Sequence, residues 1–288
     1  MNMKKTKQLK LLDELIKYLS DNEMIHSVIV RGSISKGLSD KYSDIDLLLI
    51  TKNEYFGDFI QNVYDLINKK VPILTESGWI DTNVPNFGGI GYVFLVEYEN
   101  EIIQLDLYTL PEENAKRIWE FEDKIVIQTQ DSINFKTNID LENNRFTEII
   151  SNIELGHSPD FQDFFDILLH FEMLSKYLCR KNVYLSCKYW HLLHSKMLKI
   201  IRKYLDRKTA DFMFYDVERH LSSYESSFLE KFETHLKEFK GFFDFDSFLN
   251  LYEQFTDMCK TIYPDIYNDN KKLLKDLRSY IVKIYENS

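Results

Sequence analysis

A glycine-serine pair and two closely spaced aspartates are the residues near the start of the chain that are most able to do chemistry. Gly32 and Ser33 open the segment GSISKGLSDKYSDIDLLLI, and Asp44 and Asp46 lie where it becomes apolar. Residues two apart in a β-strand point to the same face, so the two carboxylates should project together while Ile45 points into the core. Carboxylates this close repel each other unless a divalent cation takes oxygen ligands from both. The spacing therefore predicts a magnesium site.

The residues ahead of the aspartates are typical of a phosphate-binding turn. At Gly32 the missing side chain permits close approach of the backbone, and a short helix over residues 33–38 would direct its free amides outward. Ser33 could add a hydroxyl donor or serve only as a helix cap. Lys36 and Arg31 could offset phosphate charge, although each taken alone is better explained as a solvated surface charge. A metal site beside a phosphate site indicates phosphoryl or nucleotidyl transfer.

The glycine-serine pair, followed by DID at residues 44–46 within an apolar run, resembles the signature of the DNA polymerase β-type nucleotidyltransferase superfamily. Within it, the size of the chain and its helical second half are similar to those of the nucleotidyltransferases that modify aminoglycoside or lincosamide antibiotics. The resemblance implies a mixed sheet flanked by helices and a nucleoside triphosphate, ATP being expected first, bound with Mg²⁺. It also implies transfer of a nucleoside monophosphate to a hydroxyl of a small molecule, with release of pyrophosphate.

The superfamily carries a third carboxylate on a neighbouring strand, and the resemblance assigns that role to Asp106, both as metal ligand and as catalytic base. Asp106 interrupts the apolar alternation of IIQLDLYTL, where Gln104 and Tyr108 would share its face. Glu97, in the preceding apolar run, is the alternative base. The predicted catalytic and metal-binding residues are Asp44, Asp46 and Asp106, and the predicted nucleotide-binding residues are Gly32, Ser33 and Lys36.

Simpler interpretations compete with these assignments. Asp44 and Asp46 by themselves could lie on the solvent face of an edge strand, but their combination with the glycine-serine pair and with Asp106 argues against it. His191 and His194 stand three residues apart in a helical pattern, which could suggest a metal site. Because a third ligand is lacking, we expect partial burial or a surface role for these histidines instead.

The elements that must position the site residues change in character once along the chain. Between Ile25 and about Leu110, strand-like runs rich in β-branched and aromatic residues alternate with glycines, and helices are predicted over 6–20 and 56–70. After Asp160 apolar residues recur every three or four positions almost to the end, as in a helical bundle. The fold class is therefore α+β. A polar segment before residue 146 places the boundary near 140, with a nucleotidyltransferase catalytic domain over 1–140 and a helical acceptor-binding domain over 141–288.

Composition restricts the partners and the compartment. The chain of 288 residues has a net charge of −10, and residues 1–140 contain 15 Lys and Arg against 23 Asp and Glu. Because nucleic-acid binding relies on basic side chains, a nucleic-acid partner is not expected, whereas a cationic small molecule would be attracted. No apolar stretch is long enough to span a membrane, and the three scattered cysteines indicate neither a disulfide framework nor a zinc site. These features favour a cytoplasmic protein.

Three functional classes remain open from the sequence. The first is a nucleotidyltransferase that modifies a small molecule, an antibiotic being the leading candidate. The second is a nucleotidyltransferase that acts on a protein or on the end of a tRNA, of which the acidic composition disfavours the tRNA. The third is a nucleotide-binding module of the same fold without catalysis, although three clustered carboxylates would then cost stability for no purpose. The sequence does not determine the oligomeric state.

Overall fold

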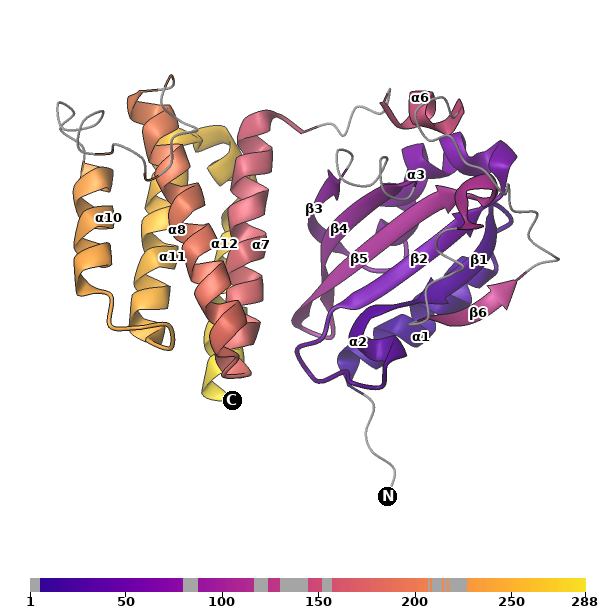
Figure 1. Cartoon of the computed structure of the whole chain (residues 1–288), viewed down its shortest axis with the longest axis horizontal. Helices are drawn as coiled ribbons and strands as arrows, with labels where there is room; N and C mark the ends of the chain where they lie inside the picture. The colour runs from indigo at the N-terminus through magenta and orange to yellow at the C-terminus, as the bar shows by residue number, and fades with distance from the viewer. Residues whose placement is uncertain are drawn as a thin grey trace. The chain divides into compact units, whose positions relative to one another are not determined.

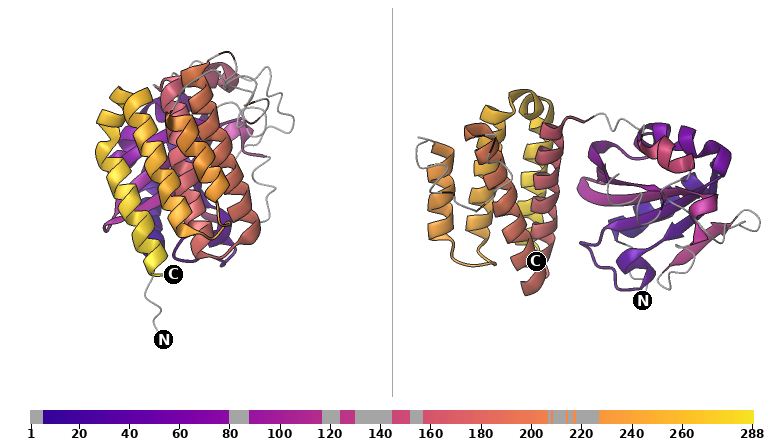
Figure 2. Two further views of the ribbon diagram at one scale, coloured as in Figure 1. Left: turned by 90° about the vertical axis from the view of Figure 1, so that its left-hand side faces the viewer. Right: turned by 45° about the horizontal axis from the view of Figure 1, so that its top comes forward.

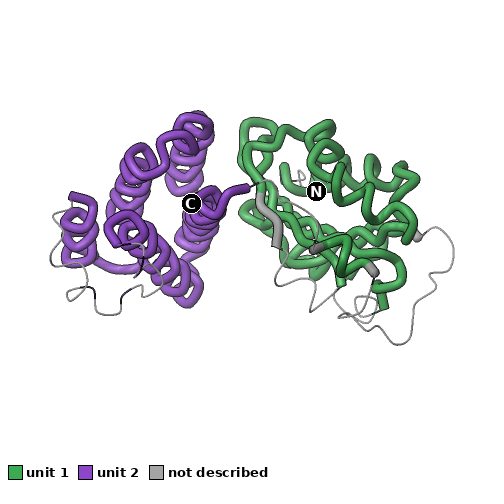
Figure 3. The backbone as a smooth tube through the Cα atoms, turned by 90° about the horizontal axis from the view of Figure 1, so that it is seen from above, with its two compact units in different colours: residues 1–156 green, residues 157–288 purple. Residues whose placement is uncertain are grey.

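The computed structural model describes residues 6–79, 88–116, 124–129, 145–151, 157–206, 208, 214, 217 and 227–288. The chain forms two compact units, Met1–Gly156 and His157–Ser288 (Figure 3). Unit 1 contains a sheet and its flanking helices, and unit 2 is helical in its described part. The predicted α+β fold class is confirmed.

Unit 1 is built on a six-stranded mixed sheet (Figure 1). Its strands are β1 (Ile25–Val30), β2 (Ile45–Thr51), β3 (Ile73–Trp79), β4 (Ile90–Tyr98), β5 (Glu101–Pro111) and β6 (Ile125–Thr129). Their order across the sheet is β3-β4-β5-β2-β1-β6. The central pair β2 and β5 is parallel, and every other neighbouring pair is antiparallel. The strands expected from the apolar runs are β1, β2, β4 and β5, whereas β3 and β6 were not predicted.

Helices α1 (Lys7–Ser20) and α3 (Phe56–Asn68) cover one face of this sheet (Figure 1). Leucines at helical spacing on α1 form a stripe that enters the core, and Thr6 caps the helix by accepting a hydrogen bond from the amide of Leu9 at 3.4 Å. On α3, Phe56, Phe59 and Val63 pack into the same core. Both helices agree with the sequence prediction to within two residues at each end.

The two faces of the sheet differ in what they carry. Odd-numbered residues of β2 and β5, such as Leu47 and Leu107, join the large core under the helices. Leu48 on β2 and Tyr108 on β5 belong instead to a smaller apolar cluster on the other face. Since side chains alternate along a strand, the even-numbered Asp46 and Asp106 project on this second face, away from α1 and α3.

The boundary between the units follows Gly156 and not residue 140, because a short helix near the end of unit 1 packs on its core. In α6 (Arg145–Ser151), the ring of Phe146 meets that of Phe56 edge-on, with centroids 5.4 Å apart. Ile150 of the same helix is fully buried in that core. The prediction assigned residues 141–156 to the helical domain, and these contacts assign α6 to unit 1.

Unit 2 consists of long helices that run nearly parallel or antiparallel to one another (Figure 2). They are α7 (Pro159–Cys179), α8 (Val183–Leu205), α10 (Ser227–Glu238), α11 (Phe245–Ile262) and α12 (Pro264–Glu286). Side-chain caps begin two of them, because Ser158 accepts from the amide of Phe161 and Asn182 from that of Leu185. All five helices were expected from the apolar periodicity. None of the described helices is long and apolar enough to cross a membrane.

Helices α7 and α8 are joined along one side by ion pairs. Three aspartates at successive turns of α7 lie opposite three lysines of α8. The pairs are Asp166 with Lys196, Asp163 with Lys199 at 3.4 Å and with Lys203 at 3.0 Å, and Asp160 with Lys203. Burial alone would lower the pKa of Lys203, but its hydrogen bonds to Asp160 and Asp163 raise that pKa overall. These three aspartates of α7 therefore help to hold the two helices together.

Candidate functional site

Asp46 and Asp106 lie side by side on the two central strands of unit 1. In the parallel pairing of β2 with β5 they are direct partners in register. Adjacent strands are about 4.8 Å apart, so the two carboxylates leave the same face from neighbouring positions. Asp46 is half-buried and Asp106 is 9% exposed. The structure thus brings together two of the three predicted catalytic carboxylates from positions 60 residues apart (106 − 46).

Asp44 lies just ahead of β2, one residue before the first residue of the strand. A tight turn precedes Asp44. In this turn the carboxylate of Asp40 accepts hydrogen bonds from the amide of Tyr42 at 2.9 Å and from the hydroxyl of Ser43 at 3.0 Å. Asp44 itself is half-buried. Asp44 therefore lies immediately before the strand that carries Asp46. The prediction had placed it on the strand itself.

Gly32 is required at its position by both space and backbone conformation. A Cβ atom added to Gly32 would lie 1.8 Å from Oδ2 of Asp46, and the φ angle of this residue is +67°. The neighbouring amide of Arg31 donates to the backbone carbonyl of Asp46 at 2.9 Å. Because only glycine fits a left-handed conformation against a carboxylate, the turn and the strand are adjusted to each other. The prediction of close backbone approach at Gly32 agrees with this geometry, although it was made for phosphate.

The helix that follows Gly32 is shorter than predicted. It is α2, Gly32–Ser35, and it begins at the glycine itself, with Arg31 in the capping position. Ser33 is therefore inside the helix, so its interpretation as a helix cap was wrong. Ser33 is half-buried, and its hydroxyl makes no hydrogen bond to another residue that the structure describes. Lys36 follows the helix and is exposed.

Gln104 and Tyr108 flank Asp106 on the same face of β5, as the alternation predicts. The amide Nε2 of Gln104 donates to Oδ1 of Asp106 at 2.9 Å, and the Gln104 side chain is 2% exposed. Burial raises the pKa of the Tyr108 hydroxyl, and the nearby charges of Asp106 and Asp46 raise it further. Tyr108 is therefore a neutral donor at the edge of the carboxylate pair.

Glu97, the alternative base, lies farther along the sheet. Its partner in β5 is Ile102, whereas Asp106 is opposite Val93 of β4. The separation of four residues corresponds to about 13 Å along the strand. Glu97 is half-buried on the same strand as Val93. The carboxylate that the sheet places directly beside Asp46 is that of Asp106.

No group of three or more His, Cys, Asp or Glu side chains among the described residues is arranged to hold a metal ion in this conformation. The three-aspartate metal set therefore stays a prediction. The backbone places two members of the set in adjacent strands, and carboxylate oxygens are the ligands that Mg²⁺ prefers. These two donors fit a divalent cation in type, and they start from neighbouring backbone positions.

His191 and His194 have different environments. His191 is exposed, whereas His194 is buried with its Nε2 atom 3.0 Å from Nε2 of His235 on α10. Burial, with a contribution from His235, lowers the pKa of His194 to about 3, so its imidazole is neutral at pH 7. Trp190 stacks on this pair. The expectation of a surface role or burial for the two histidines is confirmed.

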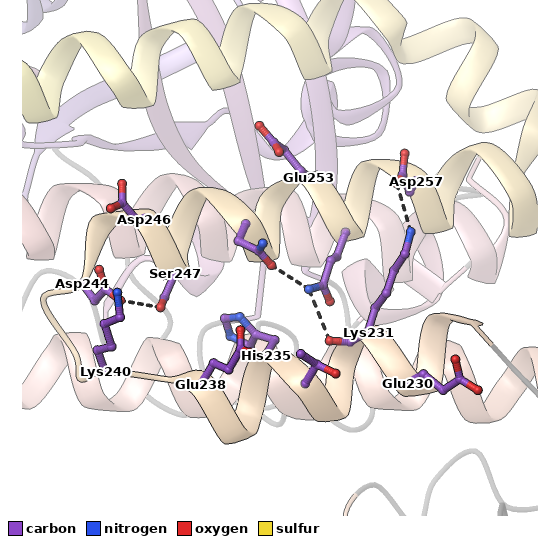
Figure 4. Close-up of a pocket in the computed structure, with 13 residues that line it drawn as sticks. Glu230, Lys231, His235, Glu238, Lys240, Asp244, Asp246, Ser247, Glu253 and Asp257 are labelled. Carbon is purple, nitrogen blue, oxygen red and sulfur yellow. Dashed lines mark hydrogen bonds and ion pairs between the residues drawn. The ribbon is translucent and has the colours of Figure 1, made fainter.

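A cavity of about 610 Å³ lies in unit 2 between α10 and α11 (Figure 4). Six carboxylates and two lysines are part of its lining, together with His235 and neutral polar residues. The carboxylates are Glu230, Glu238, Asp244, Asp246, Glu253 and Asp257, and the lysines are Lys231 and Lys240. None of the predicted catalytic or nucleotide-binding residues lines this cavity. It is an acidic recess of unit 2 that the sequence prediction did not identify.

A comparison with protein families identifies the class of unit 1. The model of the nucleotidyltransferase domain family matches residues 12–155, which is half of the chain and nearly the whole of unit 1. The chain therefore belongs to the nucleotidyltransferase domain family, as the resemblance to the DNA polymerase β-type superfamily implied. Membership implies a nucleoside triphosphate as co-substrate and transfer of its nucleoside monophosphate. The comparison with curated proteins found no match.

Proposed function

We propose that this protein is a Mg²⁺-dependent nucleotidyltransferase that transfers a nucleoside monophosphate from a nucleoside triphosphate, ATP in the first instance, to a hydroxyl of a small molecule. The observation that carries the proposal is the direct pairing of Asp46 with Asp106 on adjacent parallel strands, next to the glycine turn at Gly32. Two like charges in neighbouring positions repel each other unless a cation lies close to both or one carboxylate holds a proton.

The proposed roles follow from where each residue lies. Asp44, Asp46 and Asp106 would hold the metal, which when bound neutralises charge that develops on the phosphates. The backbone at Gly32, the hydroxyl of Ser33 and the exposed ammonium of Lys36 would contact the triphosphate.

Asp106 is assigned as the catalytic base in preference to Glu97. The acceptor hydroxyl oxygen forms a bond to the α-phosphorus, the bond from that phosphorus to the pyrophosphate oxygen breaks, and the hydroxyl proton passes to Asp106. The register supports this choice because Asp106 is beside Asp46, whereas Glu97 is opposite Ile102. Asp106→Asn should retain nucleotide binding and lose most turnover. An equal loss of nucleotide affinity would make Asp106 chiefly a metal ligand.

The acceptor proposed first is an aminoglycoside or lincosamide antibiotic, bound with the help of unit 2. The support is the resemblance in size and architecture, the net charge of −10, and the acidic cavity between α10 and α11. A polycationic aminoglycoside needs several carboxylates to satisfy its ammonium groups, which favours it over the less charged lincosamides. The protein would work in the cytoplasm, where the nucleotide is available.

The test is pyrophosphate release from ATP and from GTP with Mg²⁺, measured against a panel of aminoglycosides and lincosamides. Asp46→Asn is the blank. Acceptor-dependent release by the native protein and none by the variant is the expected result. Nucleotide and metal binding without release for any panel member would overturn the antibiotic acceptor, and labelled nucleotide on a protein or tRNA would then support a macromolecular acceptor. Absence of nucleotide binding would overturn the proposal as a whole.

A further inference from the structure

Gln104 is a buried amide in direct contact with the proposed catalytic base. It lies two residues before Asp106 on β5, and its Nε2 atom donates to Oδ1 of Asp106 at 2.9 Å. Its exposed fraction is 2%, and its cross-strand partner on β4 is Leu95, which is fully buried. An amide among such neighbours gains little from burial except through the hydrogen bonds that it makes.

The second polar atom of Gln104 shows that the fold alone does not account for this residue. Its Oε1 atom is buried and makes no hydrogen bond to any other residue that the structure describes. A buried acceptor without a donor lowers the stability of the folded state, and an apolar side chain of the same size would avoid that loss. Among the described residues, the side chain donates its hydrogen bond to the carboxylate of Asp106.

That hydrogen bond suits a carboxylate that must act as a base. A donor fixed at Oδ1 limits rotation of the carboxylate, so its other oxygen keeps one direction. A neutral amide achieves this without bringing a positive charge, whereas lysine or arginine at position 104 would compete with a metal for the negative charge of Asp106 and Asp46. The amide thus orients the carboxylate and leaves its charge in place.

We propose that Gln104 is a positioning residue, which holds the Asp106 carboxylate in the orientation needed to accept the proton of the attacking hydroxyl. The inference rests on the proposed function, since it presupposes that Asp106 is the base. It extends that function by adding a residue that acts through Asp106.

The experiment compares Gln104→Met with Thr109→Val. Methionine keeps the length of the side chain and removes the amide. Thr109 lies on the same strand but on the opposite face, and its buried Oγ1 likewise has no hydrogen-bond partner among the described residues, so valine there is a matched change of a buried polar group. For Gln104→Met we expect kcat to fall about 10- to 100-fold, with KM for the nucleotide within about twofold and an unchanged or higher Tm. Thr109→Val should change neither constant.

A second readout separates this inference from the proposed function. Crystal structures of both variants without ligands should show the Asp106 carboxylate turned or in two conformers in Gln104→Met, and unchanged in Thr109→Val. An unchanged Asp106 together with an unchanged kcat would overturn the positioning role. Equal loss of kcat in both variants, accompanied by a lower Tm, would also overturn it in favour of a structural role. If the native protein releases no pyrophosphate with any acceptor, the proposed function fails, and the orientation of Asp106 still decides whether Gln104 positions it.

Discussion

The aspartates of the two units have different neighbours. In unit 2 each aspartate of the α7 series faces a lysine of α8, so charge is compensated and two helices are tied together. In unit 1 Asp46 is instead the in-register partner of another aspartate, Asp106, and Gln104 and Gly32 lie next to the two carboxylates. The aspartates of α7 that join two helices are placed opposite cations, whereas the two carboxylates that we propose for the reaction are placed beside each other. Substitutions in each unit can test this difference.

The largest effect is expected from Asp46→Asn. The change removes one of two adjacent negative charges, so transfer should fall by at least about 10³-fold while the fold keeps or slightly gains stability. Pyrophosphate release and thermal unfolding on the same preparation measure both quantities. A variant that retained full activity would remove the metal role from Asp46, and one that unfolded would make this aspartate a structural residue like those of α7.

The next effect concerns Gly32 and has a matched control in Gly37. Both glycines have nearly the same φ angle, +67° and +66°, but a Cβ atom at Gly32 would meet Asp46 whereas nothing lies within 4 Å of one at Gly37. Alanine should therefore destabilise at either position by about 1–2 kcal/mol through backbone strain. Only Gly32→Ala should also displace the carboxylate and reduce transfer, by about 10²-fold. Equal activity of the two alanine variants would contradict the fit of Gly32 to Asp46.

A smaller effect, on stability and not on transfer, is expected from Asp163→Asn in unit 2. Asp163 contacts both Lys199 and Lys203, which are partly exposed. Loss of these pairs should lower the free energy of unfolding by about 1 kcal/mol and leave transfer unchanged. Urea unfolding at low and high salt measures the loss of unfolding free energy. The difference in this free energy between the variant and the native protein should shrink at high salt, because salt screens the ion pairs. A loss of transfer without a loss of stability would show that the contrast between the units is wrong.

The last effect is a pH dependence of stability within unit 2, with no effect on transfer. His194 has a pKa of about 3 in the folded protein against 6.5 when unfolded, so between these values the unfolded chain binds more protons. The contribution of this neutral imidazole to stability is complete above pH 6.5 and is lost as the pH falls toward 3. In His194→Gln the free energy of unfolding should depend less on pH between 6.5 and 4.5 than in the native protein. His191→Gln, an exposed change on the same helix, should keep the native slope.

The main elements of both units could be predicted from the sequence because their apolar patterns are long. The apolar run of β1 matches the observed strand at both ends, and the bundle helices show their period over many turns. Strand β6 is short and is paired only with β1, and α6 buries few side chains, so neither has a distinctive local pattern. Because α6 was not predicted, the boundary between the two units was placed from the polar segment alone. That boundary was residue 140, whereas unit 1 ends at Gly156.

The residues of the proposed site could be named from the sequence, but their geometry could not. The spacing of Asp44 and Asp46 and the break in alternation at Asp106 predicted three carboxylates on strands, of which Asp46 and Asp106 lie on strands and Asp44 precedes one. That Asp46 and Asp106 are partners in register depends on which strands lie next to each other, which no local pattern reports. The hydrogen bond from Gln104 to Asp106 could not be predicted for a related reason. The alternation of side chains along a strand puts these two residues on the same face, but it does not show whether their side chains touch.

The register of β2 with β5 also bears on how the protein matures. A slip of one residue would turn Asp106 to the helix-covered face, so a mispaired chain could be compact and still have no site. The pairing closes a loop of about 60 residues that contains α3, β3 and β4, and contacts so distant in sequence form late in folding. During refolding, transfer activity should therefore appear after helical circular dichroism has recovered.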